Sequence, residues 1–123
     1  MKVSFDIPAS RAALAAALEG LVATNYLILG SGNFPSIYRS GVVYRPELAG
    51  VEEWRTVPQV IRAGWGDCED LASWRAAELR IAGVPAQAAV VRTGPRRFHA
   101  VVRYPDGQIE DPSRRLGMLK GKR

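Results

Sequence analysis

The chain has 123 residues, 47% hydrophobic and 24% charged, which is typical of one globular domain and excludes a globally disordered chain. Its 17 Lys and Arg exceed its 12 Asp and Glu by five. Residues 114–123 contain five basic side chains and no acidic one, so the remainder of the chain is formally neutral. We therefore expect one domain over residues 1–113, followed by a basic tail over residues 114–123.

The single cysteine cannot form a disulfide within the chain, which favours a reducing compartment. The start of the chain is not typical of a signal peptide, because it contains Asp6 and Pro8. The apolar stretch 12–29 is interrupted by Glu19, so a buried amphipathic helix explains it better than a membrane span. We expect a cytoplasmic protein that does not engage a membrane.

The first third of the chain predicts one extended segment, one helix and one loop. Apolar and polar residues alternate over residues 3–7, which indicates a short strand or an extended arm. Pro8 and Ser10 then open a helix with apolar side chains at helical spacing, and the Gly-Ser-Gly sequence at 30–32 stops it. Residues 30–50 are rich in Gly and Pro and contain two Tyr residues as aromatic anchors, so they predict a long loop that is either functional or a packed connector.

Two helices are expected in the middle of the chain. A short helix is predicted over residues 57–63, and the Gly-Trp-Gly sequence at 64–66 breaks it. A second helix is predicted to start at Asp67 and to run to about Ile81. Asp67 suits the N-cap position, and Asp70, three residues later, completes an arrangement similar to a capping box.

The last part of the chain predicts an antiparallel meander. Strands are expected over residues 86–92 and 98–104, and a third strand begins at 108–110. Turn residues separate them at 93–95 and 105–107. Helices followed by a meander predict an α+β fold, in which the N-terminal helices pack on a small antiparallel sheet.

Cys68 and His99 are the only residues of their types, and the predicted elements allow them to meet Asp111. Cys68 lies in the first turn of a helix, where N–H groups stabilise an anion. His99 and Asp111 lie on neighbouring strands that can hold them side by side. An imidazole activates a thiol, and a carboxylate orients the imidazole. Acidic neighbours of Cys68 would raise its pKa, although they also suit a helix start.

Four motifs that include these residues resemble those of the transglutaminase-like superfamily. The sequence GWGDCEDLA at 64–72 is similar to its G-x-G-D-C-x-D motif, in which the Cys opens a helix. The sequence LRIAGVPA at 79–86 resembles its joint between helix and strand. The sequence FHAVV at 98–102 resembles its His-containing strand, and EDP at 110–112, followed by Ser113, resembles its D-P-[ST] ending.

The resemblance covers about residues 54–113 and implies a papain-like α+β fold with a Cys-His-Asp triad. Carried over by position, it makes Cys68 the nucleophile, His99 the acid and base, and Asp111 the orienting carboxylate. The activities of the superfamily are hydrolysis of peptide or isopeptide bonds, amide transfer and deamidation.

The chain departs from the family pattern in three respects. It is short, it lacks the Trp that often follows His-Ala, and its N-terminal half does not match the region that supplies an oxyanion donor. Gln59, Trp65 and Asn33 are candidates for that donor, together with the backbone N–H of Cys68. Small stand-alone forms of this type also resemble proteins of bacteriophages or prophages. That resemblance implies a location in the bacterial host cytoplasm or on the virion, and a phage or host protein as partner.

The sequence therefore predicts a thiol-dependent amidohydrolase or peptidase that acts on a peptide or protein through an acyl-enzyme, with transamidation as a variant. The alternative is a catalytically silent scaffold or assembly protein that binds a partner with help from the tail over 114–123. We expect no cofactor and no metal, because one thiol and one imidazole fall short of the usual zinc ligand sets. Nucleic acid is expected to contact the tail weakly at most.

Overall fold

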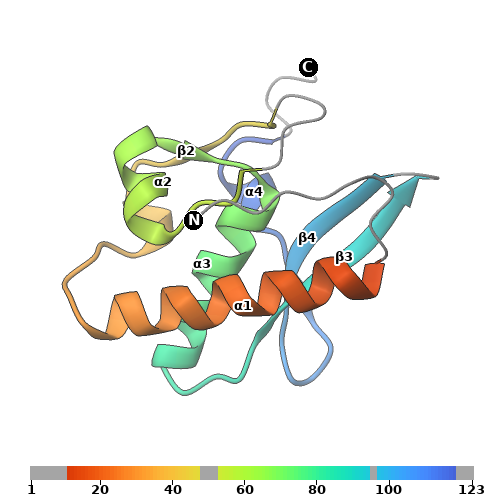
Figure 1. The fold of residues 1–123 in the computed structure, drawn as a ribbon, viewed down its shortest axis with the longest axis horizontal. Coiled ribbons are helices and arrows are strands. Elements are labelled where there is room, and N and C mark those ends of the chain that lie inside the picture. Colours follow the sequence, from red (N-terminus) through yellow and green to blue (C-terminus); the bar gives the residue numbers. More distant parts are fainter. Residues whose placement is uncertain (1–10, 48–52, 95–96, 119–123) are drawn as a thin grey trace.

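The computed structural model describes residues 11–47, 53–94 and 97–118, and it has an α+β fold, as expected (Figure 1). An N-terminal helix packs with further helices and with a small three-stranded antiparallel sheet. The elements in chain order are α1 (Arg11–Gly30), the 3₁₀ helix η1 (Ile37–Arg39), β1 (Val43–Tyr44), α2 (Val57–Ala63), β2 (Trp65–Gly66), α3 (Cys68–Ile81), β3 (Gln87–Gly94), β4 (Arg97–Arg103), β5 (Ile109–Glu110) and α4 (Pro112–Arg115).

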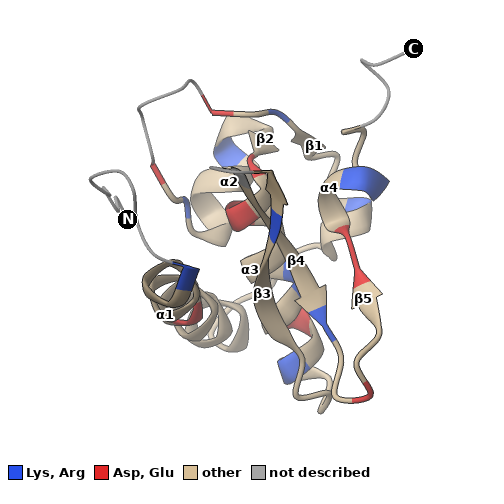
Figure 2. Cartoon of the chain, turned by 90° about the vertical axis from the view of Figure 1, so that its right-hand side faces the viewer, with Lys and Arg blue, Asp and Glu red and all other residues tan. Residues whose placement is uncertain are grey.

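The larger sheet has the strand order β3-β4-β5, and both pairs of neighbours are antiparallel. Helix α3 lies behind this sheet and packs on β4, while α1 packs on β3 and on α3 (Figure 2). A second, two-stranded sheet is formed by β1 and β2, which are parallel. It lies at the N-terminal end of α3, so the residues before that helix are held by a strand from a distant part of the chain.

Helix α3 contributes side chains to both hydrophobic clusters of the core. Ala72 and Ala76 belong to the cluster shared with α1 and the sheet, and their small size allows α1 to approach closely. Leu71 and Trp74, on another side of α3, belong to the cluster shared with α2 and η1. All four residues are fully buried, so α3 is the central element of the fold.

A buried asparagine joins the three long helices. The side-chain amide of Asn25, on α1, donates to the hydroxyl of Ser73 on α3 at 3.3 Å. Its carbonyl oxygen accepts the backbone N–H of Val57, the first residue of α2, at 3.0 Å. All three residues are fully buried, so the Asn25 amide and the Val57 N–H depend on these hydrogen bonds, while the Ser73 hydroxyl also donates to the carbonyl of Asp70 at 3.1 Å.

We expect Asn25→Ala to destabilise the protein by about 2 kcal/mol, because it leaves the backbone N–H of Val57 buried without an acceptor. Urea titration of the free energy of unfolding measures the change. Thr24→Ala is the matched control, because the Thr24 hydroxyl donates only to the carbonyl of Gly20 in its own helix. That control should stay within about 0.5 kcal/mol of the parent. Equal losses in the two variants would contradict the bridging role of Asn25.

The local predictions for the second half of the chain are largely confirmed. Helix α2 has the predicted bounds, α3 begins one residue after Asp67, and the turn at 105–107 connects β4 to β5 through Gly107 at a φ of 91°. Strand β3 continues to Gly94, so the turn expected at 93–95 begins later than predicted. The arm expected at 3–7 lies outside the described residues.

Two segments are more ordered than expected. The loop expected over 30–50 contains η1 and β1. The basic tail expected over 114–123 begins inside the fold, since Arg115 ends α4 and Leu116 packs on the core. The carbonyl of Leu116 also accepts the backbone N–H of Tyr44 at 3.0 Å.

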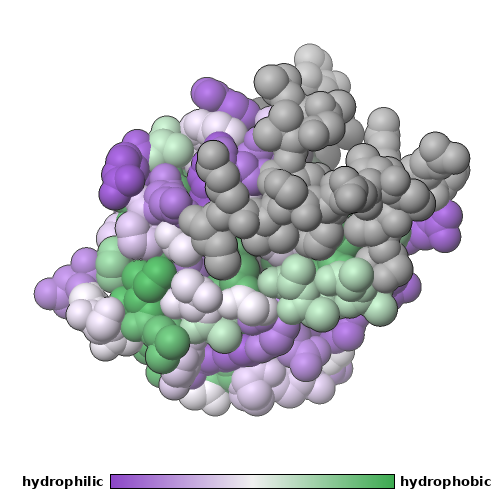
Figure 3. Space-filling model, in the orientation of Figure 1, coloured by the Kyte–Doolittle hydropathy of each residue, from purple (hydrophilic) through white to green (hydrophobic). Residues whose placement is uncertain are grey.

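Helix α1 is long and apolar enough, by length and composition, to cross a membrane, a property that core helices of soluble proteins share. One face is packed, since Leu18, Leu21 and Val22 are fully buried. Tyr26 and Leu27 on the other face are 43% and 71% exposed, and Figure 3 shows an apolar region over this end of α1. The amphipathic packing of α1 is confirmed, and the absence of a membrane role stays an expectation.

Candidate functional site

The first turn of α3 carries Cys68 and is capped as predicted. Asp67 is the N-cap residue, and its carboxylate accepts the backbone N–H of Cys68 at 2.7 Å. In return, Asp70 accepts the backbone N–H of Asp67 at 3.1 Å, which completes the capping box. Helix N-terminal N–H groups that would otherwise lack partners are satisfied in this way, and the position of Cys68 is fixed.

The same two carboxylates hold neighbouring segments. Asp67 Oδ2 accepts the backbone N–H of Glu47 at 2.9 Å, and Asp70 Oδ1 accepts the backbone N–H of Arg55 at 2.7 Å. The guanidinium of Arg55 also lies 3.5 Å from Asp70. Burial raises the pKa of Asp70 to about 7, although these N–H groups and the Arg55 charge lower it. The carboxyl of Asp70 is therefore a buried titratable group beneath the site.

A carboxyl group whose pKa is raised on folding stabilises the protein below its unfolded pKa of 3.8, and this contribution is lost as the pH rises through about 7. We expect the stability of the parent to fall more steeply between these pH values than that of Asp70→Asn. Denaturant titration across this range measures the slopes. Asp106→Asn, in an exposed turn, is the control and should follow the parent; an unchanged slope in Asp70→Asn would refute the prediction.

The thiol of Cys68 lies between a carboxylate and the edge of β4. The side chain is 8% exposed, and Sγ donates to Glu69 Oε2 at 3.0 Å. The backbone N–H of Ala100, on β4, donates toward Sγ. Burial, followed by the charges of Glu69 and Asp67, raises the pKa of Cys68 well above its ordinary value, and the Ala100 N–H opposes this in part. The resting group is therefore a protonated thiol, and the expected effect of the acidic neighbours is confirmed in direction.

His99 and Asp111 lie side by side, as the sequence predicts. His99 Nε2 is 2.8 Å from Asp111 Oδ2. Burial would raise the pKa of Asp111, but the hydrogen bond and charge of His99, with backbone N–H groups of Arg114 and Ser113, lower it below its usual value. Asp111 is also the N-cap of α4, where it accepts the N–H of Arg114 at 3.3 Å, so a helix start fixes the carboxylate.

His99 on β4 and Asp111 at the start of α4 thus come together, and Cys68 at the start of α3 is linked to the same part of β4 through the Ala100 N–H. His99 directly precedes Ala100, whose N–H is directed at the thiol. Nε2 of His99 is hydrogen-bonded to Asp111. Nδ1 is therefore the ring nitrogen that could exchange a proton with Cys68. In this arrangement the thiol proton is shared with Glu69 instead, so a shift of the thiol would precede any transfer to His99.

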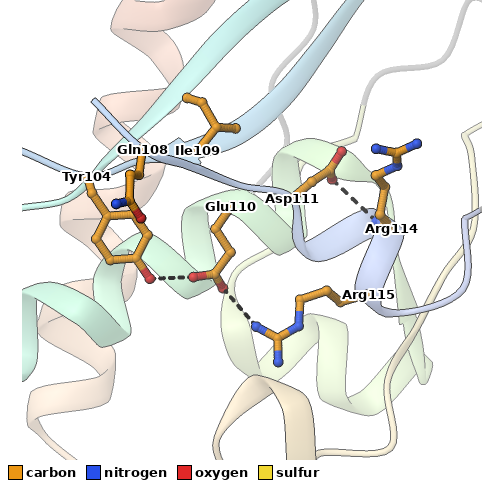
Figure 4. A pocket seen from close by; sticks show the side chains of 7 residues that line it. All are labelled: Tyr104, Gln108, Ile109, Glu110, Asp111, Arg114 and Arg115. Atoms are coloured by element: carbon orange, nitrogen blue, oxygen red, sulfur yellow. Dashed lines mark hydrogen bonds and ion pairs between the residues drawn. The ribbon is translucent and has the colours of Figure 1, made fainter. Parts of the chain in front are cut away.

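Glu110, next to Asp111, takes part in a separate network. Its carboxylate accepts the hydroxyls of Tyr38 and Tyr104 and the Nε–H of Arg75 at 2.8 Å. Figure 4 shows Glu110 directed at Tyr104 and Arg115, while Asp111 is bonded to the backbone of α4. The two acidic residues therefore act on different sides of the strand end, as neighbours on one strand do.

The three side chains proposed as oxyanion donors occupy different settings. Asn33 is exposed in the segment between α1 and η1. The amide oxygen of Gln59 accepts the backbone N–H of Thr56 at 2.8 Å in the cap of α2. The ring of Trp65, on β2, lies under the guanidinium of Arg55 at 4.2 Å.

The backbone N–H of Cys68, the fourth candidate, donates to Asp67 in this structure. That N–H is therefore engaged at rest, and the described geometry singles out none of the four.

Sequence reasoning missed Tyr44 as a member of the site. Tyr44 pairs with Gly66 in the parallel β1–β2 sheet, and Gly66 directly precedes Asp67, the N-cap of α3. Burial first, and then the charges of Asp67 and Cys68, with those of Glu69 and Asp111, raise the pKa of Tyr44 to about 12. The phenol therefore lies within electrostatic range of the Cys68 thiol and of the Asp111 carboxylate. The expectation of aromatic anchors in the loop 30–50 was the sequence signal, but nothing local indicated which elements Tyr44 would reach.

Three ligand-bearing atoms of Asp67, Cys68 and Glu69 lie within 4.8 Å of one another, a spacing compatible with a metal ion. Both oxygens of Asp67 already accept backbone N–H groups, from Cys68 and Glu47, so a metal would compete with the cap of α3. The absence of a metal therefore stays an expectation.

Comparisons with protein-family models, with curated proteins and with solved structures found no match for this chain.

We expect Glu69→Gln to lower the pKa of Cys68, because it removes the largest charge that disfavours the thiolate. At neutral pH, alkylation by iodoacetamide should become faster, by about tenfold for each unit by which the pKa falls. Intact-protein mass spectrometry measures the rate at the single cysteine. Glu19→Gln on α1 is the control and should react as the parent does. A slower reaction of Glu69→Gln would show that Glu69 assists the thiol instead.

Proposed function

We propose that the protein is a thiol-dependent amidohydrolase or peptidase of the transglutaminase-like type, which cleaves a peptide or isopeptide bond through an acyl-enzyme. The observation that carries the proposal is the pairing of His99 Nε2 with Asp111 Oδ2 at 2.8 Å, one residue from the Ala100 N–H that faces the Cys68 thiol. Three separate elements deliver these groups to one place. The papain-like arrangement of the fold, implied by the motif resemblance, is part of the same proposal.

In the proposed reaction, Cys68 Sγ attacks the carbonyl carbon of the substrate while His99 Nδ1 takes the thiol proton. The C=O electron pair moves to oxygen, and the tetrahedral intermediate collapses when the imidazolium protonates the leaving amine. Asp111, kept ionised by its lowered pKa, stabilises the imidazolium. Water then hydrolyses the thioester, or a second amine takes the acyl group in a transamidation.

The raised pKa of Cys68 means that the thiol loses its proton as it attacks and is not a preformed thiolate. A substrate that displaces Sγ from Glu69 toward His99 would start the reaction. Cys68 is 8% exposed, so only a narrow part of a substrate could reach the thiol. The proposed substrate is a peptide or protein of phage or host origin, in the host cytoplasm or on the virion.

The experiment that tests the proposal is the pH profile of Cys68 alkylation by iodoacetamide, followed by intact-protein mass spectrometry. His99→Ala should slow alkylation by at least about tenfold at neutral pH, because the thiol loses its proton acceptor. Asp111→Asn should give a smaller reduction. Arg103→Ala, on the same strand and face as His99, is the matched control and should leave the rate unchanged. Equal rates in His99→Ala and the parent would refute the proposal.

Turnover is then measured on a peptide library that contains free peptide and isopeptide bonds, with Cys68→Ala as the control. Products that appear with the parent and disappear with Cys68→Ala would identify the bond cleaved. A mass gain equal to an added amine would identify transamidation.

The second candidate is a catalytically silent scaffold or assembly protein that binds a partner. The observation that favours it is the hydrogen bond from Cys68 to Glu69, which leaves the thiol protonated and not engaged with His99. A basic tail could contribute to partner binding, but removal of residues from 114 onward would also remove Arg115 and Leu116, which pack on the fold. Truncation after Met118 removes three basic residues and keeps Arg115 and Leu116. Partner binding that is lost on this truncation and kept in Cys68→Ala would support the scaffold.

A further inference from the structure

The hydroxyl of Tyr44 is placed to take part in the proposed reaction. In the parallel β1–β2 ladder, Tyr44 lies opposite Gly66. A Cβ built on Gly66 would meet Asp70 and Leu71 of the first turns of α3, at 3.1 and 3.2 Å, and Val60 of α2 at 3.3 Å. Cross-strand partners direct their side chains to the same face, so the side chain of Tyr44 also lies on the side of α3.

Hydrogen bonds on two sides fix the backbone at Tyr44. Its N–H donates to the carbonyl of Leu116, at the end of α4, at 3.0 Å. The next residue, Arg45, donates to the carbonyl of Gly66 at 2.9 Å, just before the N-cap of α3. Tyr44 is therefore held between the helix that begins with Cys68 and the helix capped by Asp111.

The ring of Tyr44 packs against the same hydrophobic cluster that contains Cys68. Four acidic groups of the site, including the thiol and Asp111, act on its hydroxyl, which stays protonated throughout the neutral range. Among the described residues, the hydrogen bonds of the site leave this hydroxyl without an acceptor, so it can donate to a group that enters.

We propose that the Tyr44 hydroxyl donates a hydrogen bond to the oxyanion that forms when Cys68 attacks a carbonyl. The inference rests on the proposed function and supplies the donor that the sequence left open. A phenol that stays protonated suits this role, because an oxyanion is stabilised by a fixed donor that does not itself ionise. The Cys68 N–H, by contrast, already donates to Asp67.

The test compares two reactions of the same thiol. Iodoacetamide reacts by displacement at a saturated carbon, so no oxyanion forms. Para-nitrophenyl acetate reacts at its carbonyl: the C–S bond forms, the carbonyl electron pair moves to oxygen, and collapse releases para-nitrophenolate and leaves an acetyl thioester. A donor to the oxyanion accelerates the second reaction and leaves the first unchanged.

We expect Tyr44→Phe, which keeps the ring, to acylate at least about tenfold more slowly with para-nitrophenyl acetate, since loss of one oxyanion donor costs about 10²–10³-fold in amide hydrolysis. Its alkylation by iodoacetamide should stay within about twofold of the parent. Tyr26→Phe, on the exposed face of α1, is the matched control and should change neither rate. Cys68→Ala corrects for acetylation at other sites, and thermal unfolding verifies that Tyr44→Phe is folded.

The outcomes separate this inference from the proposed function. Equal losses of both rates in Tyr44→Phe would show that the phenol acts on the thiol itself, and unchanged rates would show that it only packs; either result overturns the oxyanion role. If His99→Ala alkylates as fast as the parent, the proposed function fails irrespective of Tyr44. If alkylation depends on His99 and only acylation depends on Tyr44, both are supported.

Discussion

The hydrogen bonds at the first turn of α3 hold the candidate site together. Asp67 and Asp70 satisfy N–H groups of that turn, and their remaining oxygens accept N–H groups from Glu47 and Arg55. The start of α3 therefore holds the segments around Glu47 and Arg55, which do not belong to a helix or strand. Because Asp70 is buried, loss of any of these partners would leave a polar group without compensation. These backbone hydrogen bonds of Asp67 and Asp70, and not an interaction of the thiol, fix the position of Cys68.

Acidic residues at the start of α3 favour the helix but disfavour ionisation of the Cys68 thiol. Burial raises the pKa of Cys68 most, and the charges of Glu69 and of the cap residue Asp67 raise it further, so a residue that fixes the cysteine also disfavours its thiolate. His99 and Asp111 are the part of the site that acts in the other direction, since a pair of imidazole and ionised carboxylate can accept the thiol proton. In the proposed reaction, the substrate would have to move the thiol from Glu69 to His99 before the proton is transferred.

Much of the second half of the fold could be predicted, because its signals are local. The bounds of α2 follow from Thr56 and Gly64, and the start of α3 follows from its capping box. The pairing of His99 with Asp111 followed from their places on either side of a short hairpin. The parallel β1–β2 pair joins residues with no shared local signal, so neither it nor the approach of Tyr44 could be predicted. The hydrogen bond from Cys68 to Glu69 depends on packing around the thiol, which a residue pattern does not specify.

The short length of β5 connects the sheet to the site. Its pairing covers only Val102 and Arg103 of β4, so the edge of β4 at Ala100 is not taken by β5, and the Ala100 N–H is available to the thiol. Pro112 ends the strand because it has no N–H for a ladder, and it suits the first position of a helix. Asp111 then becomes the N-cap of α4 and turns toward His99. The Asp111-Pro112 sequence therefore has two effects: it ends β5 before the strand reaches Ala100, and it places the Asp111 carboxylate beside His99.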